Sequence, residues 1–353
     1  QTDDLSRFEK TVSKNYYNDP SSKLRLIGIT GTNGKTTTAF FLKTLLDCFW
    51  PKTGLIGTCK YIIGEKEYHS SHTTPDIVKN QKMLNQMLQT GAEAAVMEVS
   101  SHGLSQNRVE GLTFSRTLFT NITHDHLDYH KSFSNYLSAK EKLFKMNPEM
   151  GIVNRDDPYH RFFSRHLTNV LTYGVENDCD IRGKILYRTI DGMEVEVEAF
   201  SEKQRLFLPV LGLHNLYNFL AALSVCLSYS FAFSQIIQRL DSFPSVPGRL
   251  EKVAEGVFID YAHTPDALEK VLSALKKITA GKLILLFGCG GNRDAEKRAP
   301  MGNTAKAYAD YVIVANDNPR DEDPDKIIYE ITRNDPFFII EKDRRSAIKK
   351  ALE

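Results

Sequence analysis

The chain has 353 residues, of which 41% are hydrophobic and 25% charged, and its formal net charge is +1 at pH 7. This composition is typical of a globular protein with two domains, and the charge gives no electrostatic case for nucleic acid or an acidic membrane surface. No apolar run is long enough to span a bilayer. The five cysteines are scattered and include no Cys-x-x-Cys pair, which favours a reducing cytoplasm over a disulfide framework or a thiolate zinc site.

The first 22 residues are polar and are predicted to be a linker or the tail of a preceding domain. The chain starts without methionine and stops inside a charged helical pattern, so we expect it to be the middle of a longer protein. From residue 23 to 246 strand and helix patterns alternate, which predicts an α/β domain with a central parallel sheet covered on both faces. Strands are expected at 24–30, 54–59, 94–99, 117–121 and 151–154, and helices at 36–48, 76–89, 133–144 and 216–228. Period-two patterning in 178–209 predicts a small antiparallel add-on.

A turn-rich segment, 244–249, is the predicted domain boundary, so the second domain is expected at 247–353. A second strand–helix series follows it and predicts a Rossmann-like α/β domain. Its strands are expected at 256–260, 282–287, 311–315 and 337–340, and its helices at 265–278, 299–309, 324–332 and 344–352. Ligands of open parallel sheets bind beyond the carboxyl ends of the strands, and the polar motifs of this chain follow its predicted strands.

The stretch 26–38 reads Leu-Ile-Gly-Ile-Thr-Gly-Thr-Asn-Gly-Lys-Thr-Thr-Thr and has the strand–loop–helix pattern of a phosphate-binding loop. Gly31 and Gly34 allow the tight turn, Lys35 can reach the β- and γ-phosphates, and the Thr36 hydroxyl can bind magnesium. The loop departs from the general pattern because Ile29 stands where that pattern has glycine. The alternative is an ordinary glycine-rich turn before a helix.

Three further groups follow strands of the first domain. Glu98 ends a buried strand and is a natural ligand for nucleotide-bound magnesium, or else a helix N-cap or ion-pair partner. The segment 121–130 holds three histidines and two aspartates, but their spacing matches no standard zinc motif. We therefore expect turn and capping groups there, with His126 alone as a ligand. Lys140, on an amphipathic helix, would by itself be taken for a surface lysine.

In the second domain, Asp260 and His263 end the first predicted strand, and two polar loops, 288–293 and 316–320, end the next two. The glycine-rich loop 288–293 has no G-x-G-x-x-G pattern, which argues against a dinucleotide turn. Arg293 and Arg320 at neighbouring strand ends are suited to bidentate binding of a carboxylate. The alternative is a structural ion pair within each turn.

Together these motifs resemble the Mur ligases, ATP-dependent enzymes that build the cell-wall peptide, over nearly all of residues 23–353. The loop 30–37 looks like their ATP loop. Segments 73–76, 98–104, 125–130 and 260–265 look like the MurE branch, and Asp-Asn-Pro-Arg at 317–320 looks like the specificity motif of its diaminopimelate-adding members. Two parts of the family pattern are missing from the sequence: the N-terminal uridine-binding domain and the C-terminal end, with its Gly-Lys-Gly-His-Glu-like segment.

The resemblance implies ligation of meso-diaminopimelate to UDP-N-acetylmuramoyl-L-alanyl-D-glutamate through an acyl phosphate, with ATP as co-substrate and two magnesium ions. It implies catalytic roles for Lys35, Glu98, His126 and Lys140. ATP is expected at Gly31, Thr32, Asn33, Gly34, Lys35, Thr36, Thr37, Asn218, Arg249 and Asp260. The muramoyl dipeptide is expected at His72, Thr73, Thr74, Ser100, Gln106 and Arg108. Diaminopimelate is expected at Arg293, Asp317, Asn318, Pro319 and Arg320. The metal ligands are expected to be Thr36, Glu98, His126 and Lys140, the last as a carbamate on its ε-nitrogen.

The expected partners are these small molecules, with no nucleic acid and no membrane span, and a cytoplasmic monomer is expected. Hinge closure about 247–248 is expected to assemble the site. Two other functions stay open from the residues: a ligase similar to folylpolyglutamate synthase, and a non-catalytic nucleotide-binding paralogue. Asp-Asn-Pro-Arg argues against the first, and the joint presence of Lys35, Glu98, His126 and Lys140 argues against the second.

Overall fold

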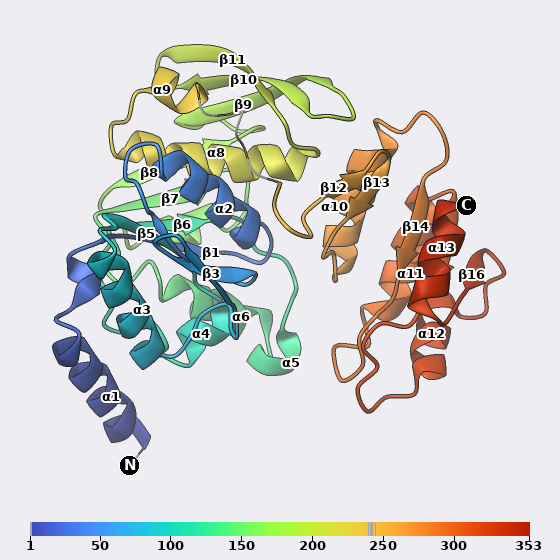
Figure 1. Cartoon of the computed structure of the whole chain (residues 1–353), viewed down its shortest axis with the longest axis horizontal. Helices are drawn as coiled ribbons and strands as arrows, with labels where there is room; N and C mark the ends of the chain where they lie inside the picture. Colours follow the sequence, from blue (N-terminus) through green and yellow to red (C-terminus); the bar gives the residue numbers. More distant parts are fainter. Residues whose placement is uncertain (1, 239, 241–242, 244) are drawn as a thin grey trace. The chain divides into compact units, whose positions relative to one another are not determined.

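The computed structural model describes residues 2–238, 240, 243 and 245–353, and the chain divides into two compact units (Figure 1). The first unit comprises 1–187, 192–210 and 214–247, and the second comprises 188–191, 211–213 and 248–353. The predicted boundary segment is 244–249, of which Pro244 lies outside the described residues.

The first unit is built on one sheet with the strand order β11-β10-β9-β8-β7-β6-β1-β5-β2-β3-β4. Its middle is parallel, because β1 pairs with β5 and β6, β5 with β2, and the series β6, β7, β8 and β9 continues in the same direction. The described strands are β1 (Arg25–Thr30), β2 (Gly54–Ile56), β3 (Lys60–Ile63), β4 (Lys66–His69), β5 (Ala94–Glu98), β6 (Arg116–Phe119), β7 (Met150–Asn154), β8 (Val170–Gly174), β9 (Ile181–Arg188), β10 (Met193–Ala199) and β11 (Glu202–Leu208).

Helices cover both faces of this sheet (Figure 1). Along β1, Ile27 and Ile29 enter one hydrophobic core and Leu26 enters the other, as the period of two in a strand requires. The described helices of the unit are α1 (Thr2–Tyr16), η1 (Pro20–Ser22), α2 (Lys35–Leu46), α3 (Ile77–Gln89), α4 (Ser101–Ser105), α5 (Leu127–His130), α6 (Phe133–Glu141), α7 (His160–Ser164), α8 (Leu213–Ser228) and α9 (Phe233–Ile237).

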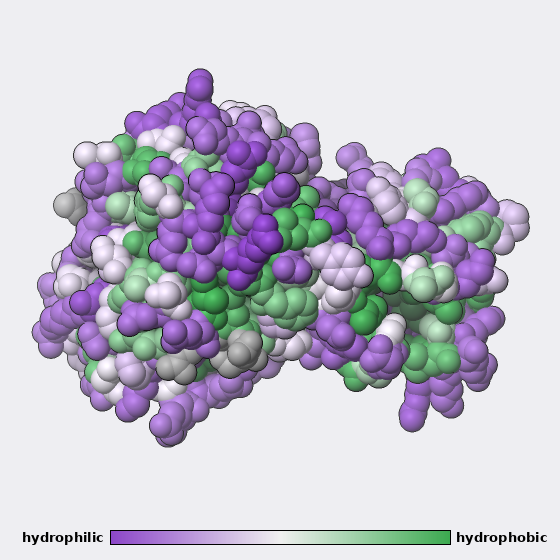
Figure 2. All heavy atoms as spheres, turned by 90° about the horizontal axis from the view of Figure 1, so that it is seen from above, coloured by the Kyte–Doolittle hydropathy of each residue, from purple (hydrophilic) through white to green (hydrophobic). Residues whose placement is uncertain are grey.

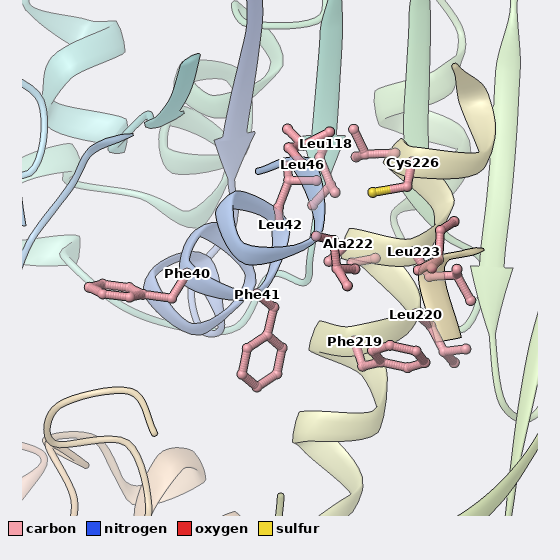
Figure 3. Close-up of a cluster of buried hydrophobic side chains, with 14 of the residues drawn as sticks. Phe40, Phe41, Leu42, Leu46, Leu118, Phe219, Leu220, Ala222, Leu223 and Cys226 are labelled. Atoms are coloured by element: carbon pink, nitrogen blue, oxygen red, sulfur yellow. The ribbon is translucent and has the colours of Figure 1, made fainter. Parts of the chain in front are cut away.

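The core on one face joins α2 and α8 to the sheet. Figure 3 shows Leu42 and Leu46 of α2 near Leu118 of β6, with Ala222 and Cys226 of α8 beside them, and all five side chains are fully buried. Because α2 directly follows the glycine loop, this packing fixes the direction in which the helix leaves the loop.

Several elements differ from the sequence-based predictions. Strands β3, β4 and β8 were not predicted, and the antiparallel segment is continuous with the central sheet because β9 pairs with β8. The polar stretch expected as a linker or tail forms helix α1, whose Lys10 makes a 2.8 Å ion pair with Glu110. A polar composition does not prevent a helix when one stripe packs on the body of the protein, as α1 does on α3.

The second unit contains a parallel sheet in the order β14-β15-β16 and a separate hairpin of β12 and β13. The expectation that 256–260 begins the parallel series was wrong, because β13 pairs antiparallel with β12 instead. Asp260 holds the end of this hairpin by accepting hydrogen bonds from the amides of Leu250 (2.8 Å) and Ala262 (2.7 Å). The strands are β12 (Glu251–Ala254), β13 (Val257–Ile259), β14 (Ile284–Phe287), β15 (Tyr311–Val314) and β16 (Phe338–Ile340), and the helices are α10 (Pro265–Lys276), α11 (Arg298–Tyr308), α12 (Pro324–Thr332) and α13 (Arg344–Leu352).

The face of the molecule in Figure 2 is mostly hydrophilic, with hydrophobic side chains in smaller patches. Within the described part of the chain, no helix combines the length and the apolar character that a membrane crossing needs.

Candidate functional site

The glycine loop lies between the carboxyl end of β1 and the first turn of α2. Gly31 and Gly34 have φ angles of 152° and 86°, which L-residues rarely adopt. A Cβ atom at Gly31 would lie 1.9 Å from Thr120 Oγ1, and one at Gly34 would lie 2.3 Å from Asn218 Oδ1. Both positions therefore require glycine on conformational and steric grounds.

The loop is held from the neighbouring strand end, after β6. Thr120 Oγ1 donates to the Asn33 carbonyl (2.7 Å), and the Asn121 side chain both accepts from Asn33 N (3.0 Å) and donates to Asn33 O (3.0 Å). Thr32 N donates to the Asn121 carbonyl (2.8 Å). These hydrogen bonds fix the backbone of the loop at the amino end of α2, a position that in other helices favours an anion.

Two lysines converge on this loop. Lys35 Nζ donates to the carbonyls of Gly31 (2.8 Å) and Thr32 (2.9 Å), and Lys140 Nζ donates to the same Gly31 carbonyl (2.7 Å). Lys140 is 1% exposed, so it is not the surface lysine that its helix pattern alone suggests. Burial, and then the charge of Lys35, lower the pKa of Lys140 well below its usual value, against an opposing effect of Asp125.

Glu98 ends β5 with no solvent exposure, and its carboxylate faces the start of α2. It accepts hydrogen bonds from Thr36 Oγ1 (2.8 Å), Thr58 N (2.8 Å) and Thr58 Oγ1 (3.0 Å). It is not the N-cap of the following helix, since Ser100 caps α4. A Cβ atom at Gly57 would lie 2.3 Å from Glu98 Oε1, so the turn after β2 is shaped around this carboxylate.

Thr58 was not predicted as a site residue, because the predicted strand 54–59 extends beyond the end of β2 at Ile56. The sequence feature that could have identified Thr58 is the Gly-Thr pair directly after a buried strand. This pair indicates a site residue only once β2 is known to lie next to β5 in the sheet. Thr58 Oγ1 also lies 3.0 Å from Thr73 Oγ1, so it connects Glu98 with a second predicted binding residue.

The donor atoms beside the loop fit magnesium. Thr36 and Glu98 offer a hydroxyl and a carboxylate oxygen, the ligand types that this hard cation prefers. In the described residues the structure brings together no group of three or more His, Cys, Asp or Glu side chains that could hold a metal ion. A small number of protein ligands is enough for magnesium, because this ion usually keeps several bound waters and also binds phosphate oxygens of a nucleotide.

His126 precedes the short helix α5 with a φ angle of 53°. Its ring centroid is 4.8 Å from that of His102, and its Nε2 atom is 3.3 Å from Asp125 Oδ2. Burial lowers the pKa of His126 to about 4; the charge of Asp125 opposes this shift, and the charges of His102, Lys35 and Lys140 add to it. The imidazole is therefore neutral at pH 7 and can act as a ligand.

Three of the residues expected to hold the muramoyl dipeptide adjoin one another at the end of β5. Thr74 Oγ1 donates to the Glu98 carbonyl (2.9 Å) and accepts from Ser100 N (2.9 Å), while Arg108 Nη1 donates to the Thr74 carbonyl (2.8 Å). Thr74 is 1% exposed. Its side chain therefore fixes the segment that carries the other two rather than facing solvent.

The other three of these residues are more exposed. His72 N donates to the Tyr61 hydroxyl (3.0 Å), Thr73 lies beside Thr58, and Gln106 Nε2 donates to the Tyr129 hydroxyl (3.2 Å). Tyr129 also borders an open groove of about 470 Å³. The groove is lined by Ser105, Tyr129, His130, Lys131, Asn135, Ser138, Ala139 and Lys142.

Asn218 of α8 supports the glycine loop from the other side. Its Oδ1 atom accepts from Thr38 Oγ1 (3.2 Å), and its Nδ2 atom donates to Asn215 Oδ1 (3.0 Å). Arg249 and Asp260 belong to the second unit. There the guanidinium of Arg249 stacks 5.0 Å from the ring centroid of Tyr261, and burial raises the pKa of Asp260 against the lowering effect of its hydrogen bonds and of Arg249.

The second unit brings together the two loops expected to bind diaminopimelate. Gly291 N donates to the Asn318 carbonyl (2.9 Å), and Arg320 Nη1 donates to the Gly291 carbonyl. Arg293 and Asp317 are exposed beside this junction. A Cβ atom at Gly291 would lie 1.8 Å from the Pro319 carbonyl, so the loops can approach this closely only with glycine there.

The sequence reading also missed Arg298, which is 1% exposed and is the first residue of α11. A cation at the amino end of a helix is unfavourable unless it is paired. The position of Arg298 near the start of the predicted helix 299–309 could therefore have indicated that this arginine has acidic partners. Arg298 is paired with Glu322 (2.8 Å) and Glu330 (2.5 Å).

The sequence matches the Mur ligase middle domain family over residues 29–226 and the Mur ligase, glutamate ligase domain family over residues 248–353. It is 42% identical over 352 residues to the UDP-N-acetylmuramoyl-L-alanyl-D-glutamate–2,6-diaminopimelate ligase of Clostridium botulinum, covering 97% of this chain and 72% of the relative. The ligase of the same name from Aquifex aeolicus is 43% identical, covering 96% and 71%.

Among solved structures, a UDP-N-acetylmuramoyl-L-alanyl-D-glutamate–2,6-diaminopimelate ligase matches with a TM-score of 0.69 and 31% identity, covering 94% of this chain and 70% of that one. A folylpolyglutamate synthase of Mycobacterium tuberculosis, complexed with ADP and AMPPCP, matches with a TM-score of 0.79 but only 18% identity, covering 98% and 87%. The second likeness concerns the fold alone, whereas the family matches and the close relatives share sequence across both units. The chain therefore belongs to the Mur ligase family.

Proposed function

We propose that this chain catalyses the ATP-dependent ligation of meso-diaminopimelate to UDP-N-acetylmuramoyl-L-alanyl-D-glutamate, a step of peptidoglycan biosynthesis. Its relatives from Clostridium botulinum and Aquifex aeolicus carry the name of this ligase at 42% and 43% identity. The Asp-Asn-Pro-Arg sequence at 317–320 supports diaminopimelate as the amino acid.

The observation that carries the proposal is the convergence of charge at the carboxyl ends of β1 and β5. Lys35 and the buried Lys140 both contact the Gly31 carbonyl, and Glu98 contacts Thr36 at the start of α2. Such an arrangement suits a reaction in which two anions, the γ-phosphate and a substrate carboxylate, must approach each other.

In the proposed reaction the terminal carboxylate of the D-glutamyl residue attacks the γ-phosphate, and ADP leaves. The amine of diaminopimelate then attacks the acyl phosphate, an amide bond forms, and phosphate is released. Lys35 binds the β- and γ-phosphates, while the amides of the glycine loop and the amino end of α2 orient the phosphate chain. Thr36 and Glu98 would hold magnesium, which supplies positive charge between the two anions. Positioning and electrostatics do most of the work, and no covalent intermediate with the protein is needed.

A second magnesium ion, near His126, is part of the proposal, with Lys140 carbamylated on its ε-nitrogen. In carbamylation the neutral amine forms a bond to carbon dioxide and loses a proton, so a cation becomes an anion that magnesium prefers. The burial of Lys140, the nearby charge of Lys35 and the resulting low pKa favour the neutral amine that this step needs.

The remaining residues are assigned to the substrates. His72, Thr73, Ser100, Gln106 and Arg108 would bind the muramoyl dipeptide on the segment that Thr74 fixes. Thr32, Asn33, Thr37, Asn218, Arg249 and Asp260 would complete the ATP site, and Arg293 with the segment 317–320 would bind diaminopimelate. The proposed setting is a cytoplasmic monomer.

Phosphate release tests the proposal. The full-length protein, with ATP, magnesium and UDP-N-acetylmuramoyl-L-alanyl-D-glutamate, should release phosphate with meso-diaminopimelate, and much more slowly with lysine or glutamate. A preference for glutamate on a folate substrate would favour the folylpolyglutamate synthase alternative, and nucleotide binding without phosphate release would favour a non-catalytic paralogue.

Lys35→Ala is the matched inactive variant for this assay. We expect it to keep the fold and to lose much more than tenfold in turnover, because Lys35 is the loop side chain assigned to the β- and γ-phosphates. A loss of less than tenfold, about 1.4 kcal/mol of barrier, would be too small for the assigned role.

A further inference from the structure

Arg298, the first residue of α11, is the most buried arginine of the second unit. Its two terminal nitrogens form a fork on Glu322, with Nη1 to Oε2 at 2.8 Å and Nη2 to Oε1 at 3.0 Å. Nη1 also donates to Glu330 Oε2 (2.5 Å), and Nη2 to the Gly290 carbonyl (3.3 Å). One guanidinium thus contacts three parts of the unit: Gly290 in the loop after β14, Glu322 between β15 and α12, and Glu330 in α12.

The contacts of Arg298 lead directly to the two loops that carry Arg293 and Arg320. Glu322 also accepts a hydrogen bond from Asn292 N (2.5 Å), the residue immediately before Arg293. Asn292 in turn makes two bonds with Asp321, the residue immediately after Arg320: Asp321 N donates to Asn292 Oδ1 (3.1 Å) and Asn292 Nδ2 donates to Asp321 Oδ2 (3.3 Å). The network therefore fixes both loops at positions next to their exposed arginines.

Arg298 also determines which cations are available to a ligand. Its charge is neutralised by Glu322 and Glu330, so it does not itself offer a free guanidinium. Its fork takes one acceptor position on each oxygen of Glu322, and Asn292 N takes a second position on Oε1, so fewer acceptor positions of this carboxylate are left for Arg293 or Arg320. The hydrogen bond from Arg298, followed by that from Asn292, lowers the pKa of Glu322 to about 2, so the carboxylate is ionised and would otherwise compete for these arginines.

We propose that Arg298 is a positioning residue for amino-acid selection: through its fork on Glu322 it sets the spacing of Arg293 and Arg320 and keeps both free for the distal carboxylate of the amino-acid substrate. This inference rests on the proposed function, in which these arginines bind diaminopimelate. A lysine cannot replace Arg298, because an ammonium is a point charge that cannot contact both oxygens of Glu322 and also Glu330 in fixed geometry.

The test compares Arg298→Lys with a control on the same helix, Lys306→Gln. Lys306 makes a 2.5 Å ion pair with Asp335 between α11 and the segment after α12, but it contacts neither loop. In the full-length protein we measure phosphate release, the KM for each of diaminopimelate, ATP and the muramoyl dipeptide, and the thermal midpoint. We expect Arg298→Lys to raise the KM for diaminopimelate at least tenfold while the other two KM values stay within twofold. Lys306→Gln should change none of them.

A role in stability alone would give a different pattern, since it would lower the active fraction or change all three KM values together, and that result would overturn the inference. If Arg298→Lys does not fold, Glu322→Gln decides, because it keeps the side-chain shape and should give the same selective rise. In the double variant the two effects should not add, since both act through one fork. If the unmodified protein releases no phosphate with diaminopimelate, the proposed function fails, which is a separate outcome from equal KM changes in an active enzyme.

Discussion

At the scale of single residues, burial changes what a side chain can do. Lys140 and Lys35 contact the same carbonyl, yet Lys140 is 1% exposed and has a pKa far below that of an ordinary lysine. The amine is therefore available for chemistry that a solvated ammonium cannot perform. Glu98 is also fully buried, but hydroxyl and amide donors surround it instead of a cation, which leaves its charge for a ligand.

The first prediction concerns the modification of Lys140. We expect Lys140→Ala to be nearly inactive and to recover activity with added short carboxylates, which fill the anion position that the carbamate would occupy. Lys145→Ala is the control, since Lys145 lies on the surface in an ion pair with Glu141. Mass analysis at neutral pH should find a carbamate on Lys140. Near-normal activity of Lys140→Ala would contradict the assignment.

The second prediction concerns Arg320. Its guanidinium donates one bond to the Gly291 carbonyl, which leaves the rest of the fork for a substrate carboxylate. Truncating one partner of such a charge pair costs about 2–5 kcal/mol, so Arg320→Ala should raise the KM for diaminopimelate far more than the KM for ATP. Steady-state kinetics with each substrate varied in turn provides the measurement, and equal changes in both constants would exclude the role.

At the scale of elements, three strand ends and two helices meet at the glycine loop. β1 supplies the loop, the residues after β6 hold its backbone, the end of β5 supplies Glu98, and α8 places Asn218 against Gly34. Strand β1 lies between β5 and β6, so the loop emerges where connections leave the sheet in opposite directions. That is where ligands of open parallel sheets bind.

The third prediction uses this arrangement. Gly34→Ala places a Cβ atom 2.3 Å from Asn218 Oδ1 at a φ angle of 86°, so it should weaken nucleotide binding and lower stability. Gly91→Ala is a matched control, because Gly91 also has a φ angle of 86° but has nothing within 4 Å of an added Cβ. It should cost only the backbone strain, about 1–2 kcal/mol, and leave nucleotide affinity unchanged. Titration with a nucleotide and thermal unfolding of both variants separate the two effects, and equal nucleotide affinities would refute the contact argument.

At the scale of the whole molecule, the chain has separate hydrophobic cores. Two clusters lie on the two faces of the large sheet, and two others belong to the second unit. Each unit therefore buries apolar surface of its own, which is what allows a unit to unfold as a cooperative body.

The fourth prediction follows from these separate cores. Trp50, the single tryptophan, lies in the first unit, so its fluorescence reports unfolding of that unit alone. A non-hydrolysable ATP analogue with magnesium at a hundred times its dissociation constant should stabilise that transition by about 2.7 kcal/mol. A transition seen only by circular dichroism should shift much less. Identical midpoints and shifts by both probes would show a single cooperative unit instead.

The local motifs of this protein were determined by its sequence. Gly31, Gly34, Lys35 and Thr36 lie within one strand–loop–helix segment, so spacing along the chain was enough to predict a phosphate loop. Short apolar runs likewise predicted the parallel strands β1, β5, β6 and β7, because a strand buried on both faces leaves a continuous apolar run. The family resemblance added roles for distant residues such as Asn218, which remain proposals here.

Other features were decided only by the tertiary structure, because they depend on which strands become neighbours. Lys140 is buried because the last turn of α6 packs against the glycine loop. The amphipathic pattern of a helix does not show which other segment of the chain will cover its last turn. Thr58 and Glu98 are 40 residues apart in the sequence. They are in contact because β2 pairs with β5. Strand β13 pairs antiparallel with β12 and does not join the parallel sheet. A hairpin between adjacent strands closes a much shorter loop than a crossover connection does, so it costs less conformational entropy. Arg298 became a buried residue for the same reason: its partners Glu322 and Glu330 lie 24 and 32 residues away, and only the fold brings them to one guanidinium.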